Sequence, residues 1–313
     1  MLSLFLETLN ITAPVFAMLF MGLLLKRVGW IDDGFIKVAS ELVFNVTMPC
    51  LLFLGIIHAN LNEALQIGVM VYFAIATVVS FGLIWLWARW HCPVADRGIY
   101  VQGAFRGNNG IIGLALAASM YGDYGIAVGS ILAAVLIVLY NSLSSVVLAY
   151  YSPTMKSDPL SLAIGVVRNP LILGVVAAIP FAVWQIPLPG WLDQSAQYLA
   201  HMTLPLALIC IGGTLSLSAL RAGSHLAISA SLVKMVALPL VATLGAWACG
   251  FRGADLGILF LYFGAPTASV SYVMARAANG NYRLAATIVV ITTIAAIVTT
   301  NIGIFLLNWS GLI

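Results

Sequence analysis

Apolar residues run along this chain in long blocks that are separated by short polar turns. A helix needs about 20 consecutive, mostly apolar residues to cross the hydrocarbon core of a bilayer. Ten blocks approach or exceed that length, so the pattern predicts an all-α integral membrane protein with ten transmembrane helices. We place these spans at residues 5–26, 36–57, 64–88, 98–120, 126–150, 160–183, 195–217, 226–249, 255–276 and 284–308.

The composition agrees with a lipid environment. Of the 313 residues, 62% are hydrophobic and 7% are charged, and the mean hydropathy is +1.08. Soluble domains carry roughly 25% charged residues, so this chain cannot cover a water-facing surface. Its 13 basic and 10 acidic residues are too few for nucleic-acid binding. The cysteines lack CxxC spacing, and we expect no disulfide framework, metal site or cofactor: Cys50, Cys92, Cys210 and Cys249.

Basic residues mark one side of the membrane. Those near loops after odd-numbered spans are Lys26, Arg27, Lys37, Arg89, Arg97, Lys156, Arg168, Arg221, Arg276 and Arg283. Arg252 alone lies on the other side, while Arg106 and Lys234 fall inside spans. Because cytoplasmic loops carry an excess of Lys and Arg, we expect both termini to be extracytoplasmic.

The two halves of the chain resemble each other. In span 2 residues 45–49 read NVTMP, and in span 7 residues 201–205 read HMTLP. Pro14 and Pro170 in spans 1 and 6, and Asn141 and Asn301 in spans 5 and 10, fall at nearly the same separation. Five spans per half is an odd number, so the second half is inserted upside down, as in many secondary transporters. We expect repeats at residues 1–150 and 160–313, joined by a short cytoplasmic connection at 151–159. The alternative is chance similarity among apolar segments.

Spans 4 and 9 carry helix-breaking residues at related places. Residues 107–110 read GNNG, and residues 264–269 read GAPTAS. Glycine and asparagine are poor in helix interiors, and proline removes a helical hydrogen bond. Broken helices in equivalent positions point to a substrate site near the midplane, although such kinks also serve close packing. The candidate site residues here are Asn108, Asn109, Gly110, Pro266, Thr267 and Ser269.

Two cations lie deep in the spans. A buried charge is costly unless paired or hydrated, so Arg106 in span 4 and Lys234 in span 8 are candidate site residues, unless they snorkel to the interface. No Asp or Glu lies in the middle third of any span. A cavity with fixed positive charge and no buried acid favours an anion. The same absence argues against a sodium–proton antiporter.

Polar residues beside the prolines of spans 2 and 7 are weaker candidates. Asn45 and His201 either line the pocket, where His201 could carry a proton, or satisfy carbonyls freed by the nearby prolines. Asn141 and Asn301 in spans 5 and 10 are further candidates, as substrate contacts or as sodium ligands.

Several of these motifs resemble the auxin efflux carrier family. They are FRGNNGIIGL at 105–114, YGD at 121–123, RNP at 168–170, Lys234 with Pro239, and GAP at 264–266. The similarity extends over essentially the whole chain. It implies ten helices in two inverted repeats, as in bile-acid sodium symporters. It also implies a scaffold domain of spans 1, 2, 6 and 7, and a transport domain of spans 3–5 and 8–10. Spans 4 and 9 would cross at their unwound centres.

Known members of that family are often dimers and move carboxylates, which are auxin in plants and dicarboxylates such as malate or malonate in bacteria. This chain lacks the long central loop of plant members, and it has Gly107-Asn108-Asn109 where a proline is common. The resemblance suggests a bacterial inner-membrane protein.

We therefore expect a secondary transporter for small organic anions, working by alternating access with a sliding transport domain. Substrate would be held by N–H groups near residues 109–111 and 267–269. An intramembrane enzyme has no legible motif here. The open alternatives are a sodium- or proton-coupled symporter for a non-carboxylate substrate, and a receptor that binds without transport.

Overall fold

Helices make up nearly all of the regular structure in the computed structural model, which describes residues 2–59, 66–152, 159–215 and 224–313. In chain order they are α1 (Leu2–Arg27), α2 (Asp33–Leu42), η1 (Val43–Thr47), α3 (Met48–Ile57), α5 (Ile67–His91), α6 (Val94–Phe105), η2 (Asn109–Gly113), α7 (Leu114–Tyr151), α8 (Pro159–Val167), α9 (Pro170–Val183), α10 (Gly190–Thr214), α12 (His225–Leu232), η3 (Val233–Ala237), α13 (Leu238–Ala248), α14 (Gly253–Phe263), α15 (Val270–Ala277) and α16 (Tyr282–Trp309). The three η segments are single turns of π-helix. The all-α prediction is confirmed.

In the described part of the chain, seven apolar segments are long enough to cross a membrane, and each overlaps an expected span. They are Thr8–Arg27, Asp33–Ile57, Ile67–His91, Asn109–Tyr151, Gly190–Thr214, His225–Ala248 and Tyr282–Trp309. The remaining expected spans, at 98–120, 160–183 and 255–276, are each interrupted and yield shorter helices. Two of these three are the spans in which the sequence places helix breaks. Lys156, Arg221 and residues 153–158 of the expected connection lie outside the described residues.

The boundary between spans 4 and 5 differs from the expectation. After the break in span 4, the apolar segment Asn109–Tyr151 continues through 43 residues. A single bend divides it, at Gly122, where φ is 55° and ψ is −135°. A side chain at that φ would be strained, so glycine permits the bend.

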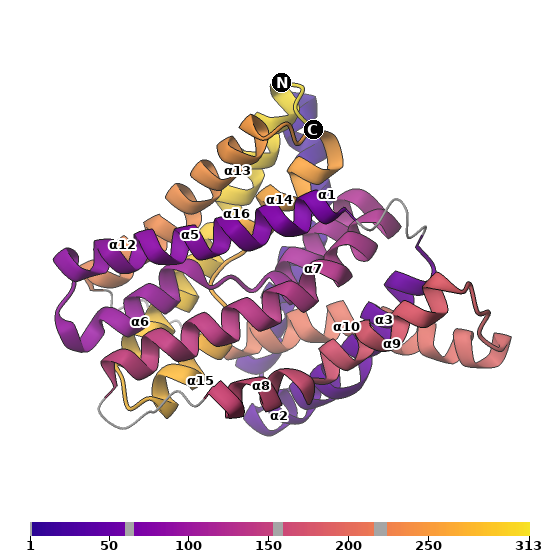
Figure 1. Cartoon of the computed structure of the whole chain (residues 1–313), viewed down its shortest axis with the longest axis horizontal. Coiled ribbons are helices and arrows are strands. Elements are labelled where there is room, and N and C mark those ends of the chain that lie inside the picture. The colour runs from indigo at the N-terminus through magenta and orange to yellow at the C-terminus, as the bar shows by residue number, and fades with distance from the viewer. Residues whose placement is uncertain (1, 60–65, 153–158, 216–223) are drawn as a thin grey trace.

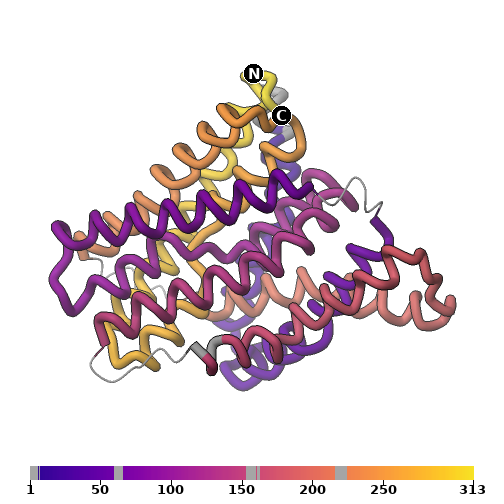
Figure 2. Tube along the Cα trace, viewed as in Figure 1, coloured from indigo at the N-terminus to yellow at the C-terminus, as the bar shows by residue number. Residues whose placement is uncertain are grey.

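We divide the helices into two groups, which contact each other where α3 packs on α7 and α1 packs on α16 (Figures 1 and 2). In the first, α1 packs against α10, and α3 packs against α9 and α10. We call this group, with α2 and η1, the α1/α10 bundle. The second group, the α7/α16 bundle, comprises α5, α6, η2, α7 and all described helices from α12 to α16. In it α5 runs alongside α7, and α16 packs against α12 and α15.

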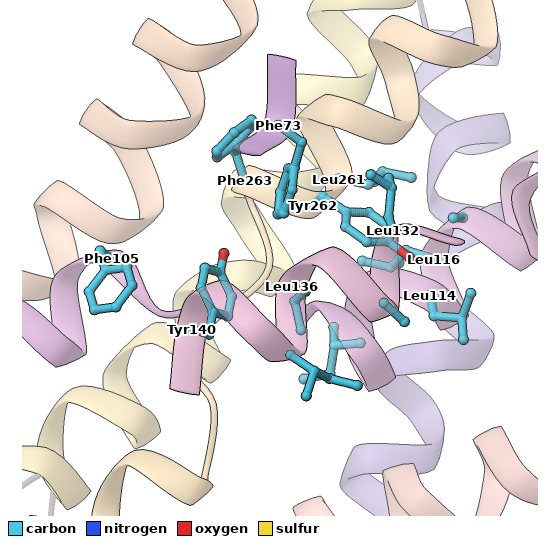
Figure 3. Packing of buried hydrophobic residues seen from close by; sticks show 14 of the residues in the cluster. Phe73, Phe105, Leu114, Leu116, Leu132, Leu136, Tyr140, Leu261, Tyr262 and Phe263 are labelled. Atoms are coloured by element: carbon cyan, nitrogen blue, oxygen red, sulfur yellow. The ribbon is translucent and has the colours of Figure 1, made fainter. Parts of the chain in front are cut away.

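An aromatic cluster fills the centre of the α7/α16 bundle (Figure 3). Phe105 and Phe263 are the last residues of α6 and α14. The Phe105 ring lies 5.5 Å from that of Tyr140 in α7, and the Phe263 ring lies 5.1 Å from that of Phe73 in α5. The Phe73 and Tyr140 rings are themselves 6.4 Å apart. The two helix ends are therefore anchored on one rigid cluster before the chain leaves helical conformation.

Candidate functional site

The breaks in spans 4 and 9 pair with each other through their backbones. Gly107 and Thr267 form an antiparallel bridge. The Asn108 N–H donates to the Pro266 carbonyl at 2.7 Å, and the Ala268 N–H donates to the Arg106 carbonyl at 3.3 Å. Unpaired peptide groups are costly at membrane depth, so this pairing stabilises two non-helical segments where neither would persist alone.

Thr267 ties the paired breaks to the surrounding helices. Its N–H donates to Thr292 Oγ1 of α16 at 3.1 Å, and its hydroxyl donates to the Gly103 carbonyl of α6 at 2.7 Å. Its side chain is buried. In this conformation both Thr267 donors therefore have protein acceptors.

Arg106 is held by α7 and α15. Its Nη2 donates to Asn141 Oδ1 at 2.8 Å, and its Nη1 lies 3.2 Å from the Tyr140 carbonyl and 3.1 Å from Ser144 Oγ. Met274 Sδ of α15 is a further acceptor. All of these partners are neutral. Asn141 thus lies behind Arg106 and orients it.

Lys234 has a different environment. Its side chain is fully buried, and its ammonium donates to the carbonyl of Phe263 at 2.9 Å. That carbonyl is at the C-terminal end of α14, where the helix dipole favours a cation. Within the described residues, ion pairs join Lys26 to Asp33 and His58 to Asp193. Neither pair includes Arg106 or Lys234.

Asn109 lies beside Gly107 and Tyr140 in the packing around the breaks. Its Nδ2 donates to the Tyr140 hydroxyl at 3.2 Å, while its buried Oδ1 has no partner among the described residues. A Cβ on Gly107 would lie 2.0 Å from that oxygen and 3.2 Å from Lys234 Nζ. A side chain at 107 would therefore have to displace the Asn109 amide, and Asn109 is part of the packing behind the breaks.

A cavity of about 430 Å³ lies between the two bundles, in the size range of ligand sites. Its lining includes Gly110 and Ile111, at the start of η2, and Ser269 and Val270, at the start of α15. The first N–H groups of a helix have no intrahelical acceptor, and the dipole there favours an anion. The Ser269 hydroxyl is buried without a partner in the described part of the chain. Arg106 also lines this cavity.

The structure brings five of the predicted site residues to the cavity: Arg106, Asn108, Gly110, Ser269 and Asn45. Five others lie behind it in the packing around the breaks: Asn109, Pro266, Thr267, Lys234 and Asn141. Asn301 is elsewhere, accepting a hydrogen bond from Thr12 Oγ1 at 2.7 Å. His201 is exposed and is not part of the lining.

Asn45 is a lining residue that also makes a hydrogen bond within its own helix. Its side chain lines the cavity, and its Nδ2 donates to the Glu41 carbonyl at 2.8 Å. The π-helical turn η1 ends directly before the Met48-Pro49 step.

Sequence reasoning missed two important lining residues, Glu41 and Tyr140. Glu41 looks like an interfacial acid because it lies near a span end. Tyr140 looks like an ordinary apolar core residue. The one sequence feature that sets Tyr140 apart is its position next to Asn141 and one turn before Ser144. This position does not show that the Arg106 guanidinium contacts Tyr140, Asn141 and Ser144.

The sequence matches a known family of membrane proteins. Residues 9–304 match the family model described as membrane transport protein. The chain belongs to this family, the auxin efflux carrier family. It is a multi-pass membrane protein of a transporter family, and the resemblance inferred from its motifs is confirmed.

Relatives from archaea and bacteria match over nearly their full lengths. An uncharacterized transporter of Methanothermobacter thermautotrophicus is 23% identical, over 94% of this chain and 97% of its own. The uncharacterized transporter MJ1031 of Methanocaldococcus jannaschii is 24% identical, over 96% and 99%. The uncharacterized transporter YfdV of Escherichia coli K12 is 21% identical, over 93% and 95%.

Proposed function

We propose that this protein is a secondary transporter for small organic anions, and that carboxylates are its substrates. The observation that carries the proposal is the cavity, in which Arg106 and the starts of η2 and α15 converge. A carboxylate there would accept hydrogen bonds from helix N-terminal N–H groups and from the Ser269 hydroxyl, next to a guanidinium whose partners among the described residues are all neutral.

The proposed architecture is ten spans in two inverted repeats, residues 1–150 and 160–313. The seven long apolar segments and three interrupted spans support this count. We further propose that the α1/α10 bundle is a scaffold and that the α7/α16 bundle carries the substrate. The cavity between them supports this division, because sliding of one bundle past the other would expose a site on one bundle to each side in turn.

The orientation of the cavity follows from the proposed topology. Ser40 lies in α2 near the start of span 2, and Thr214 lies at the end of α10; both line the cavity. The positive-inside rule assigns these ends to the cytoplasm. We therefore propose an inward-facing state of a protein whose termini are extracytoplasmic.

The experiment that tests this function is uptake of labelled malate, malonate and indole-3-acetate into proteoliposomes, with the pH gradient and the voltage set independently. We expect saturable uptake of at least one anion, with a voltage response that gives the net charge moved. Isotope counterflow separates a transporter from a receptor, because only a transporter exchanges substrate across the membrane. Binding without counterflow would refute transport, and absence of binding would refute a carboxylate site.

A further inference from the structure

Each wall of the cavity includes one residue with a charged side chain. Arg106 belongs to the α7/α16 bundle, and Glu41, in α2, belongs to the α1/α10 bundle. No other lining residue in the described part of the chain is an acid or a base of the Asp, Glu, Lys, Arg or His type. The remaining titratable groups of the lining are Tyr140 and Cys210, which ordinarily carry no charge near neutral pH.

Glu41 and Arg106 are not an ion pair in this structure. The guanidinium is turned into α7, where Asn141, Ser144 and the Tyr140 carbonyl accept from it. The Glu41 carboxylate accepts none of the hydrogen bonds identified within the described residues. An anion that enters the cavity therefore meets Arg106 on one wall and, on the other, a carboxylate that has no ion-pair partner among the described residues.

The rest of the lining is mostly apolar. It includes Met48, Leu52, Leu136, Ile137, Leu171 and Ile211, drawn from both bundles. A ligand with one carboxylate and an apolar body would match this surface. A second carboxylate would have no second cation to approach, and it would be desolvated while close to Glu41.

We propose that Glu41 is a charge filter that makes the cavity selective for monoanions with an apolar body over dianions. The proposal rests on the anion site proposed above and narrows its substrate class. Glu41 acts through space, because repulsion from a fixed carboxylate grows with the total negative charge of the ligand. Its position on the opposite bundle from Arg106 means that the filter operates when the bundles are arranged as they are here.

The test compares two ligands that share a body and differ in charge. Phenylacetate has one carboxyl group and phenylmalonate has two. At about pH 7.5 all three carboxyl groups are ionised. Binding of each is measured by titration calorimetry to the full-length protein in lipid nanodiscs. The variants are Glu41→Gln, which removes the charge, and Glu41→Asp, which keeps it. Asp123→Asn removes an exposed acid outside the cavity lining and is the matched control.

We expect the wild-type protein to bind phenylacetate more tightly than phenylmalonate. In Glu41→Gln the ratio of the two dissociation constants should shift about tenfold toward phenylmalonate, the size expected for one unit charge acting across a cavity of intermediate dielectric. Glu41→Asp and Asp123→Asn should keep the wild-type ratio.

Three results would overturn the filter. The first is an unchanged ratio in Glu41→Gln with phenylacetate still bound, which leaves the anion site intact and removes only the role of Glu41. The second is an equal shift in Asp123→Asn, which would make the effect one of net charge. The third is absence of binding of either ligand to the wild-type protein, which refutes the carboxylate site and the filter together.

Discussion

At the scale of single residues, two buried cations with the same sequence signal have different contacts. Lys234 donates to the carbonyl that ends α14, so its charge is directed at a helix end. Arg106 is oriented by neutral acceptors of α7 and remains part of the cavity lining. The sequence identifies both residues as unusual, because a charged residue within an apolar block is rare. It could not separate them, because the acceptors of each lie on other helices.

We predict that Arg106→Ala abolishes uptake while the protein still folds. Loss of a charge-assisted contact to the substrate should weaken binding about 10- to 100-fold. The Gly107–Thr267 bridge and the Thr267 contacts do not use the Arg106 side chain, so the break should keep its shape. Uptake into proteoliposomes and the thermal unfolding midpoint measure the two effects.

The matched control is Arg252→Ala, which removes an exposed arginine outside the cavity lining. Its uptake should equal that of the wild-type protein. If Arg106→Ala transports normally, Arg106 has no part in the mechanism and only the helix N-termini remain as the anion site.

At the scale of helices, the close approach of α1 and α10 depends on glycines that face the backbone of the neighbouring helix. A Cβ on Gly22 in α1 would lie 2.0 Å from the Ile209 carbonyl oxygen of α10. Reciprocally, a Cβ on Gly212 in α10 would lie 1.9 Å from the Leu19 carbonyl oxygen of α1. Small residues at helix contacts allow such packing in membranes. The sequence shows these glycines within two spans but does not reveal that they face each other.

We predict that Gly22→Ala or Gly212→Ala separates α1 from α10 and destabilises the protein. Because backbone rather than a flexible side chain blocks the methyl group, the free energy of unfolding should fall by about 1–3 kcal/mol or more. Loss of the monodisperse peak in size-exclusion chromatography and a lower unfolding midpoint measure the effect.

Gly82→Ala in α5 is the control, since nothing lies within 4 Å of the added Cβ. It should be neutral or slightly stabilising, because alanine favours helix by about 1 kcal/mol over glycine. Equal behaviour of the three variants would show that the α1–α10 contact is not as close as the structure has it.

At the scale of the whole molecule, few polar contacts between side chains of the described residues join the two bundles. One is the hydrogen bond from Thr12 Oγ1 in α1 to Asn301 Oδ1 in α16, at 2.7 Å. Both residues are buried. The sequence makes Asn301 a candidate substrate residue, and in the structure it connects the two bundles. If one bundle slides past the other during transport, this contact has to break.

We predict that a covalent link between positions 12 and 301 stops transport. The protein is Thr12→Cys/Asn301→Cys in a background whose four native cysteines are replaced by serine. Oxidation should join the helices and abolish uptake, and a reductant should restore it. Each single cysteine variant should keep its uptake under the same oxidation. Full uptake by protein shown to be completely cross-linked would refute sliding of the bundles.

The sequence by itself determined the class, the positions of most helices and the sites where two of them break. These properties are local, because they depend on the length of apolar blocks and on glycine, asparagine and proline within them. The family membership also rests on local motifs, chiefly the segment at 105–114. Properties that depend only on residues close together in the sequence can be inferred without a structure.

Only the tertiary structure decided which candidate residues line the cavity and which lie behind it. The Thr267 hydroxyl and its acceptor Gly103 are 164 residues apart, and Arg106 and Met274 are 168 apart. Partnerships over such separations depend on how the helices pack. The packing gives the Thr267 donors their protein acceptors and directs Lys234 at the end of a helix. It also brings Glu41 and Arg106 to one cavity. Each outcome requires two segments that are distant in the sequence to meet in one place.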